Sequence, residues 1–171
     1  MAGDFPIRPA TEADLPAIVG IEHAVFSDPW SLEAFRRSLA GIVTVAVSGE
    51  TVAGYLVAHY ASDFGEILNV AVHPDQRRHG IGWALVEDVL WRFAAEGVGL
   101  VFLEVRESNT AAQRLYQRMG FEAVGRRSGY YREPKEDAVV MRISNVQHPT
   151  SDAVGTPNIQ RPSADDQGSA S

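Results

Sequence analysis

The sequence predicts an α/β fold in which a mixed β-sheet is flanked by helices. Strand-like and helix-like segments alternate through residues 66–119, which is typical of a sheet covered by helices. Pairs of strand-like segments with the pattern of hairpins lie on both sides of this stretch. A chain of 171 residues also fits a single domain.

Two short helices are expected near the N-terminus. Thr11 suits the N-cap position of the first, because Asp14 follows three residues later and apolar residues come next. Ser31 is suited to cap the second helix. The strands expected in this part of the chain are residues 5–8, 43–47 and 52–58, of which the last two form a hairpin around residues 48–50.

The alternation continues through the middle of the chain. An apolar strand over residues 66–72 should end at His73-Pro74, because proline has no N–H to donate to a strand ladder. One amphipathic helix is expected to end at Gly97, and another to begin at Asn109 and end at Gly120. The apolar faces comprise Ile81, Leu85, Val86, Val89, Leu90 and Phe93 in the first helix, and Ala112, Leu115, Tyr116 and Met119 in the second. The remaining expected strands are residues 100–105, 121–127 and 138–143.

The last part of the chain differs in composition from the rest. Residues 147–171 are rich in Ser, Pro, Asp, Gln and Gly and lack apolar periodicity, so they bury too little apolar surface to offset the entropy of ordering. We therefore expect a folded domain over residues 1–146 and a disordered C-terminal tail over residues 147–171. The alternative is a strap that docks on the domain.

Composition excludes several classes of function. The formal net charge of -7 argues against a general nucleic-acid binder, which carries a basic surface, and suits a basic protein as partner. No apolar stretch approaches the roughly 18 residues of a membrane span, and nothing resembles a signal peptide. The chain has no cysteine, which excludes a disulfide and a thiol nucleophile. We expect a cytoplasmic monomer that binds no metal, membrane or nucleic acid.

The most informative segment is the loop formed by residues 77–82, with the sequence Arg-Arg-His-Gly-Ile-Gly, between a strand and a helix. Loop amides and the first amides of a helix attract an anion, and Gly80 and Gly82 let the backbone approach a phosphate closely. Arg77 and Arg78 add cationic donors. A dinucleotide fingerprint fits less well, because Leu85 stands where its third glycine belongs. From the residues alone, an ordinary strand–helix turn with a solvated basic loop remains open.

The loop resembles the Gln/Arg-x-x-Gly-x-Gly/Ala signature of the GNAT superfamily of N-acetyltransferases, which binds the pyrophosphate of coenzyme A. Further segments narrow the resemblance to the RimI-like branch, the ribosomal-protein N-terminal alanine acetyltransferases, in matching order over residues 5–143. These segments are Asp28-Pro29-Trp30-Ser31, residues 103–109, residues 115–121, and Tyr130-Tyr131 with Glu136-Asp137-Ala138 and Met141. The resemblance implies the GNAT fold, a twisted and mostly antiparallel mixed sheet in a three-layer arrangement with helices.

The resemblance also implies roles for particular residues. Acetyl-coenzyme A is the implied cosubstrate, Glu104 the proton acceptor and Tyr116 the proton donor. Trp83 departs from the family pattern, in which a smaller or basic residue stands at this position, so the resemblance supports the loop but not a particular contact of Trp83 with the cofactor. The residues implied to contact the cofactor are Val70, Ala71, Val72, Arg77, Arg78, His79, Gly80, Ile81, Gly82, Trp83 and Asn109.

Elementary chemistry leaves alternatives for both catalytic candidates. Glu104 lies in a strand otherwise made of apolar residues, where a carboxylate is unexpected unless it has a functional role or a partner. The alternative to a catalytic role is an outward-facing residue paired with Arg106. Tyr116 lies on an apolar helix face and from the pattern alone fits a packed core tyrosine. Transfer of a proton from a phenol with a pKa near 10 to a thiolate with a pKa near 8.5 is unfavourable by about 2 kcal/mol. We therefore expect Tyr116 to donate a hydrogen bond that strengthens as negative charge develops on the sulfur.

The expected acceptor is a protein N-terminus with a small first residue; by resemblance it is the alanine of small-subunit ribosomal protein eighteen, a basic protein. An α-amine with pKa about 8 is roughly one-tenth neutral at pH 7, so one carboxylate suffices as base. Residues 126–137 contain Tyr130, Tyr131, Glu133, Glu136 and Asp137, which suit a basic peptide; a plain polar hairpin loop is the alternative. Acetylation of lysine or a small amine, and a regulatory module that binds coenzyme A without turnover, are the competing functions.

Two histidines and one tryptophan also have interpretations that do not involve the chemistry. His73 and His79 flank the loop, and a solvated or capping role is expected for each. Trp91 is predicted to point away from the apolar helix face, which makes it an exposed aromatic and a candidate partner contact.

Overall fold

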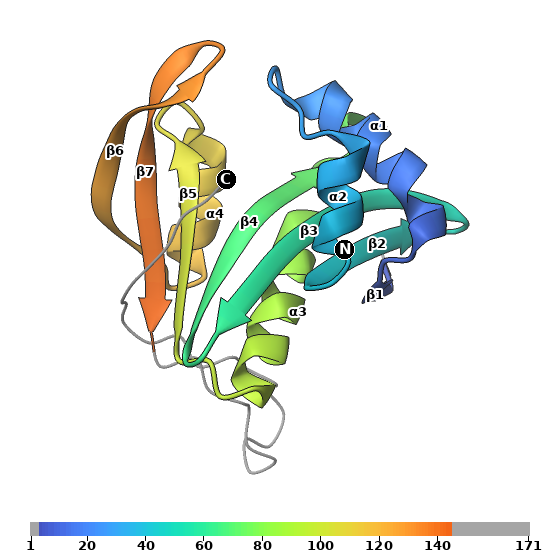
Figure 1. Cartoon of the computed structure of the whole chain (residues 1–171), viewed down its shortest axis with the longest axis horizontal. Coiled ribbons are helices and arrows are strands. Elements are labelled where there is room, and N and C mark those ends of the chain that lie inside the picture. Colours follow the sequence, from blue (N-terminus) through green and yellow to red (C-terminus); the bar gives the residue numbers. More distant parts are fainter. Residues whose placement is uncertain (1–3, 145–171) are drawn as a thin grey trace. The chain divides into compact units, whose positions relative to one another are not determined.

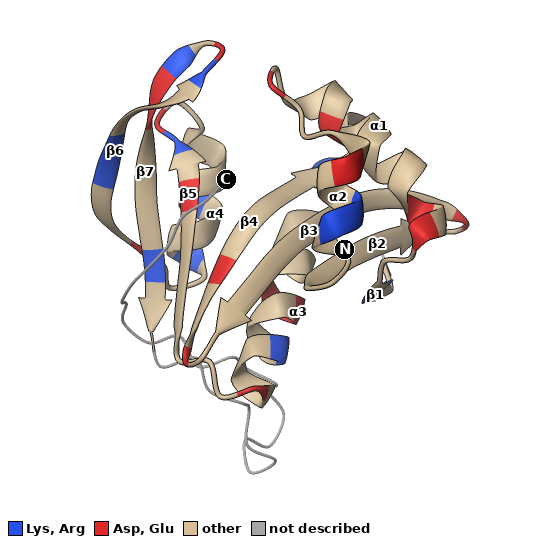
Figure 2. Ribbon diagram, in the orientation of Figure 1, with Lys and Arg blue, Asp and Glu red and all other residues tan. Residues whose placement is uncertain are grey.

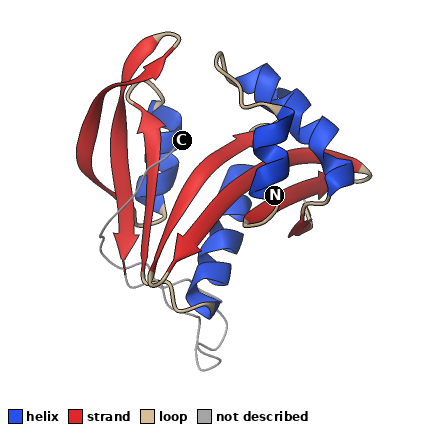
Figure 3. Ribbon diagram, in the orientation of Figure 1, coloured by secondary structure: helices blue, strands red, loops and turns tan. Residues whose placement is uncertain are grey.

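The computed structural model describes residues 4–144, and these form one seven-stranded mixed sheet with flanking helices (Figures 1 and 3). The strand order is β1-β2-β3-β4-β5-β7-β6. The strands are β1 (Ile7–Pro9), β2 (Ile42–Ser48), β3 (Thr51–Ala61), β4 (Phe64–Val72), β5 (Leu100–Arg106), β6 (Glu122–Arg132) and β7 (Lys135–Ser144). The helices are α1 (Leu15–Val25), α2 (Leu32–Ser38), α3 (Ile81–Ala95) and α4 (Thr110–Arg118), with short 3-10 turns η1 (Glu12–Asp14) and η2 (Pro74–Gln76). The predicted α/β class and mixed sheet are confirmed.

Contacts along the chain group into two compact units. The first unit comprises the chain up to His59 together with Asn69–Asp88. The second unit comprises Tyr60–Leu68 together with the chain from Val89 onward. The predicted tail, residues 147–171, lies outside the described residues. Among the helices of residues 4–144, none is long and apolar enough to cross a membrane.

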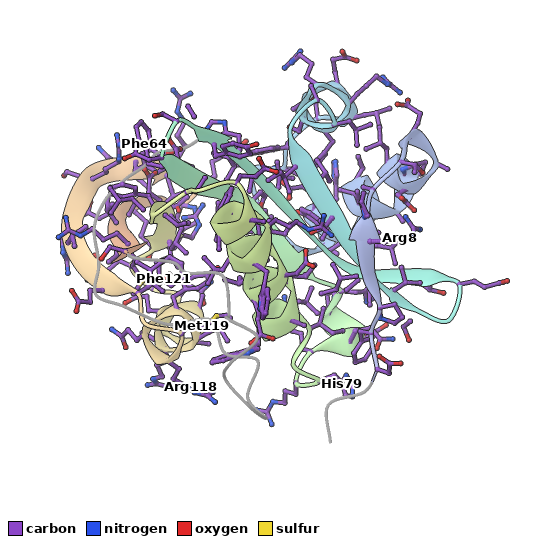
Figure 4. All side chains as sticks on the ribbon, turned by 90° about the horizontal axis from the view of Figure 1, so that it is seen from below. Arg8, Phe64, His79, Arg118, Met119 and Phe121 are labelled. Atoms are coloured by element: carbon purple, nitrogen blue, oxygen red, sulfur yellow. The ribbon has the colours of Figure 1, made fainter. Side chains whose placement is uncertain are left out.

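In the first unit, helices lie on both faces of the sheet because alternate residues of β3 are apolar on both sides. Tyr55 faces α2, with its ring 5.5 Å from that of Phe35 and at 85° to it. Gly54, the preceding residue, faces the side chains of Ile81 and Leu85 in α3. Figures 1 and 4 show α1 and α2 on one side of these strands and the start of α3 on the other.

Thr11 and Ser31 both occupy N-cap positions, but Thr11 precedes the 3-10 turn η1, whereas Asp14 is the N-cap residue of α1 itself. The backbone N–H of Thr11 donates to the Asp14 carboxylate at 2.8 Å, and Arg8 holds the same carboxylate through two bonds of 2.7 and 2.9 Å. The Arg8 guanidinium therefore lowers the pKa of Asp14, although burial opposes the shift. Ser31 caps α2 by accepting from the N–H of Ala34 at 3.1 Å.

In the second unit, β4 and β5 are parallel while β5, β7 and β6 are antiparallel. The end of α3 packs closely against β4, because a Cβ on Gly65 would stand 2.8 Å from the ring of Phe93. Asn109 caps α4 as predicted, accepting from the N–H of Ala112 at 3.1 Å. In Figure 4, Met119 and Phe121 lie where α4 leads into β6, and Arg118 projects outward.

Three features differ from the sequence-based expectations. Residues 126–137 are not a polar loop; β6 and β7 continue through them as paired strands that turn at Glu133 and Pro134. The two strands are longer than expected because cross-strand pairing offsets the low apolar content of β6, which is exposed along most of its length. Trp91 is half-buried, so the predicted exposed aromatic is wrong.

Candidate functional site

The loop between β4 and α3 presents its backbone outward at the start of a helix. Residues 77–80 are exposed, whereas Ile81, the first residue of α3, is buried. Arg78 and Gly80 both take positive φ angles, 68° and 79°, so the chain turns sharply before the helix begins. Successive amides in such a turn, together with the unsatisfied first amides of α3, form a concave group of donors suited to a phosphate.

Local bonds hold the loop in this shape. The N–H of His73 donates to the carbonyl of Ala53 at 2.8 Å, which fixes the end of β4 against β3. His79 places Nδ1 3.1 Å from the carbonyl of Gln76, and its ring lies 6.1 Å from that of Phe5. Figure 4 shows His79 in the turn ahead of α3. The predicted capping role is seen for His73, whose Nδ1 accepts from the N–H of Asp75 at 3.1 Å at the start of η2.

Gly54 sets the distance between the strands and the helix that carries the loop. A Cβ at this position would lie 2.9 Å from the carbonyl oxygen of Ala71 and 3.1 Å from Cγ2 of Ile81. The first distance, to a backbone atom, is shorter than Cβ contacts in proteins, and the second is tight, so glycine lets α3 lie this close to β3 and β4. The sequence analysis missed this residue, although an isolated glycine within a strand pattern signals a close approach.

A second missed feature is a buried carboxylate in the first unit. Glu22 of α1 is 1% exposed and accepts hydrogen bonds from the Tyr55 hydroxyl, from Nδ2 of Asn69 at 2.9 Å and from the backbone N–H of Trp30 at 2.8 Å. Burial, followed by the Glu22 charge, raises the pKa of Tyr55 above its usual range. The network joins the segment after α1 to β3 and to β4 beside Val70. Its members are far apart in the sequence, so no local sequence pattern predicts it.

Charged residues lie on β5, β6 and β7 of the second unit (Figure 2), and Glu104, Arg106 and Arg127 form what we call the charged face. The register places Arg106 beside Ala138 of β7, and Ala138 beside Arg127 of β6, so all three lie on one face. Glu104 lies two residues before Arg106 and therefore shares that face. Its partner is Arg127, with Nε 2.9 Å from Oε1, so the predicted alternative of a pair with Arg106 is wrong.

The environment of Glu104 favours its protonated form more than usual. Burial raises the pKa of this carboxyl, and the charge of Glu66 adds to the rise. The Tyr130 hydroxyl and the Arg127 guanidinium oppose the shift without cancelling it. A carboxylate with a raised pKa, held on a strand, can take up a proton readily, as a general base must.

Arg106 belongs to a neighbouring cluster. Its guanidinium lies 4.3 Å from the centre of the Tyr131 ring and 3.2 Å from the Glu136 carboxylate. Glu136 also accepts from the backbone N–H of Ser108, and this contact lowers its pKa. Burial and the nearby Glu104 and Glu136 charges raise the pKa of Tyr131 to about 12. The cluster anchors the β6–β7 hairpin to the end of β5.

Tyr116 and Asn109 lie on α4, in the same unit as Glu104. Tyr116 is 5% exposed and its ring is 5.7 Å from that of Phe121. Burial, and then the nearness of Tyr131, raise its pKa, so the phenol retains its proton and acts as a hydrogen-bond donor. The side-chain oxygen of Asn109 is engaged in capping α4.

The predicted site residues thus fall into two groups. The first unit holds Val70, Ala71 and Val72 at the end of β4 and the loop residues 77–83. The second unit holds Glu104, Asn109 and Tyr116. Each group suits one part of a group-transfer reaction, anion binding in the first and proton transfer in the second.

Comparisons with known proteins give a consistent family. The family model described as "Acetyltransferase (GNAT) family" matches residues 12–121. The chain is 33% identical over 134 residues to the ribosomal protein bS18-alanine N-acetyltransferase of Escherichia coli, covering 76% of this chain and 90% of that protein. It is 38% identical over 141 residues to the N-alpha-acetyltransferase RimI of Mycobacterium tuberculosis, covering 77% and 87%.

Solved structures agree with the sequence matches. The crystal structure of the ribosomal-protein-S18-alanine N-acetyltransferase from Escherichia coli superposes with a TM-score of 0.78 and 29% identity, covering 87% of this chain and 98% of that one.

Proposed function

The chain belongs to the acetyltransferase (GNAT) family. We propose that it is an acetyl-coenzyme A-dependent Nα-acetyltransferase of protein N-termini. The proposed acceptor is the N-terminal alanine of ribosomal protein bS18, which the curated Escherichia coli relative is named for. The observation that carries the proposal is the buried carboxylate of Glu104 on the charged face of the second unit.

The loop of the first unit fits the coenzyme. Gly80 and Arg78 in positive-φ conformations, at the start of a 15-residue helix, form a backbone cradle for a pyrophosphate. Exposed Arg77 and Arg78 add positive charge, and Gly82 keeps the first helical turn clear of a Cβ. The backbone of Val70, Ala71 and Val72 provides strand groups for the pantetheine arm. Acetyl-coenzyme A, when bound, supplies the activated thioester.

The residues of the second unit provide proton transfer. Attack on the thioester requires a neutral amine, and deprotonating an α-amine at pH 7 costs about 1.4 kcal/mol, against over three times as much for a lysine. Glu104, with its raised pKa, accepts that proton. Tyr116 retains its own proton and donates a hydrogen bond as charge develops on the leaving sulfur.

The acceptor is proposed from charge and surface chemistry. The hairpin of β6 and β7 bears Tyr130, Tyr131 and Glu136, which offer aromatic and acidic contacts to an extended basic peptide. The net charge of -7 favours encounter with a free basic protein, in the cytoplasm, over docking onto ribosomal RNA.

A competition among peptides tests the proposal. Peptides beginning with alanine, serine or a bulky residue, each with an internal lysine, are incubated together with the enzyme and acetyl-coenzyme A. We expect the alanine peptide to be acetylated fastest, at its α-amine, and a peptide with a blocked N-terminus to remain unmodified. Acetylation confined to lysine would contradict the proposal and favour a lysine acetyltransferase, and binding of acetyl-coenzyme A without any transfer would favour a regulatory module.

A further inference from the structure

The two side chains of the Glu104–Arg127 ion pair differ strongly in their exposure to solvent. The Glu104 side chain is 4% exposed, whereas that of Arg127 is 48% exposed and extends from β6, the last strand in the sheet. An exposed arginine can leave a contact and be solvated at little cost, but a buried carboxylate left alone keeps its desolvation penalty. The cation is therefore the replaceable partner of this pair.

A local irregularity of the hairpin brings two β6 side chains to Glu104. From Arg127 to Tyr131, β6 advances four positions while β7 advances two, from Ala138 to Glu136, so β6 bulges. Gly129 makes the bulge possible with a φ of 60°. In a regular strand, two residues three positions apart, such as Arg127 and Tyr130, would face opposite sides of the sheet. Because of the bulge, both act on the carboxylate of Glu104.

The Asp137 side chain holds the bulge, accepting from the Gly129 N–H at 2.8 Å. The positive φ favours glycine at this position, whereas the contact of an added Cβ with Cε of Lys135, at 2.9 Å, could be relieved by movement of that flexible side chain. Bulges of this kind re-aim side chains and are common beside active sites. The arrangement that delivers Arg127 to Glu104 is thus built into the backbone.

Bonding at Glu104 is incomplete despite the ion pair. Arg127 Nε lies 2.9 Å from one carboxylate oxygen and the Tyr130 hydroxyl also stabilises the ionised form, but neither oxygen receives a hydrogen bond of good geometry from the described residues. An ionised carboxylate offers about four acceptor positions, so unused acceptor capacity remains. An ammonium group, with three N–H donors and one positive charge, matches both that capacity and the charge of Arg127.

We propose that Arg127 is a displaceable positioning residue, which holds Glu104 as a carboxylate until the ammonium group of the acceptor takes its place. This inference rests on the proposed function. In the exchange, one cation replaces another, so the buried carboxylate is never left unpaired. One ammonium proton then passes to a Glu104 oxygen, which leaves a neutral amine and a neutral carboxylic acid, and Arg127 stays in solvent.

Among the described residues, Arg127 and Tyr130 of β6 lower the pKa of Glu104, and Glu66 of β4 raises it. Tyr131 of β6 and Arg106 of β5 are further titratable or charged neighbours, and Arg106 is paired with Glu136. Arg127 is the cation that shifts the pKa of Glu104, so its removal leaves burial and the Glu66 charge less opposed. In the free enzyme Glu104 then protonates at higher pH, while an arriving ammonium group meets no competitor.

Kinetics of the Arg127→Gln variant with an alanine-initial peptide test the exchange. We expect the acid limb of kcat/KM to move to higher pH, with about a tenfold loss relative to the parent below that limb. Well above the limb, the peptide KM should be lower than that of the parent, because the competing cation is gone. Arg127→Lys should restore the position of the limb, and the matched control Arg132→Gln, which removes another exposed arginine of β6, should leave it unmoved.

An unmoved limb, or a KM at high pH that is not lower than that of the parent, overturns the proposal. A second measurement needs no acceptor. The difference in unfolding free energy between the parent and Arg127→Gln should grow as pH rises through the titration of Glu104, since the pair stabilises only the ionised form. It should vanish in a Glu104→Gln background. A difference in unfolding free energy that does not change with pH would show that Arg127 does not stabilise the ionised Glu104. If the parent enzyme does not acetylate the peptide at all, only the proposed function is overturned.

Discussion

The loop of the first unit and the charged face of the second unit are built in different ways. The loop, residues 77–82, offers backbone amides at a helix start, and its shape depends on Gly80 and on the close packing that Gly54 permits. The charged face offers side chains, and depends on strand register and on the bulge that carries Arg127 and Tyr130. A cradle of backbone groups should tolerate a change in side-chain charge but not added side-chain volume. A face of charged side chains should tolerate a small change in volume but not the loss of a charge.

The largest effect is expected at Glu104. Glu104→Gln preserves volume and removes the base, so turnover at neutral pH should fall by at least about 100-fold, with acetyl-coenzyme A affinity unchanged. Because burial raises the pKa of Glu104, the parent loses rate as pH falls through that pKa, and the variant lacks this limb. The deficit should shrink as pH rises toward the pKa of the amine.

Steady-state rates across pH, with calorimetry for the cofactor, measure this. Glu107→Gln is the control, since it removes an exposed carboxylate one residue beyond β5. A Glu104→Gln variant that turns over like the parent would show that the charged face does not supply the base.

Added volume should act on the loop instead. Gly82→Val places a branched Cβ where the pyrophosphate approaches the first turn of α3, so the affinity for acetyl-coenzyme A should weaken by roughly thirtyfold, or about 2 kcal/mol. Gly99→Val is the matched control, because a Cβ there meets no described atom within 4 Å. Equal affinity of the folded Gly82→Val variant and the parent, measured by calorimetry, would exclude the backbone cradle.

A smaller effect is expected at Gly54. Gly54→Ala forces a Cβ to within 2.9 Å of the carbonyl of Ala71, so the unfolding free energy should fall by about 1 to 2 kcal/mol. Gly20→Ala, on α1, has open space within 4 Å and should be neutral or stabilising. Urea denaturation measures both, and a Gly54→Ala variant as stable as the parent would mean that α3 can move away from the strands freely.

The smallest effect concerns the predicted tail. Removing residues 147–171 should leave the melting temperature and turnover within error of the full chain, because this segment lacks core-forming residues. A large loss in either quantity would favour the strap that docks on the domain.

The comparison also explains what the sequence could predict. Caps such as Ser31 and Asn109, and the buried face of α3, follow from spacing over a few residues, and all are present. The loop of residues 77–82 is likewise local, so its glycines mark it. Local signals are sufficient wherever the backbone itself forms the feature.

Features that join distant segments were not predictable. The Glu22 network links residues up to 47 positions apart, and Glu104 meets Arg127 rather than Arg106 because of register in β7 and β6. A period-two pattern says which residues share a face but not which cross-strand neighbour they meet. Trp91 was misplaced for a related reason, since a half-buried helix position depends on neighbours outside the helix.

The central claim, that this enzyme acetylates a protein α-amine, is tested most directly on a whole acceptor protein. Purified ribosomal protein bS18, free of ribosomes, is incubated with the enzyme and acetyl-coenzyme A, and the modified position is mapped by mass spectrometry. The account predicts one acetyl group, on the α-amine of the N-terminal alanine, and its loss in the Glu104→Gln variant. Acetyl groups found only on lysine side chains, or an unmodified protein under conditions where the enzyme binds acetyl-coenzyme A, would contradict it.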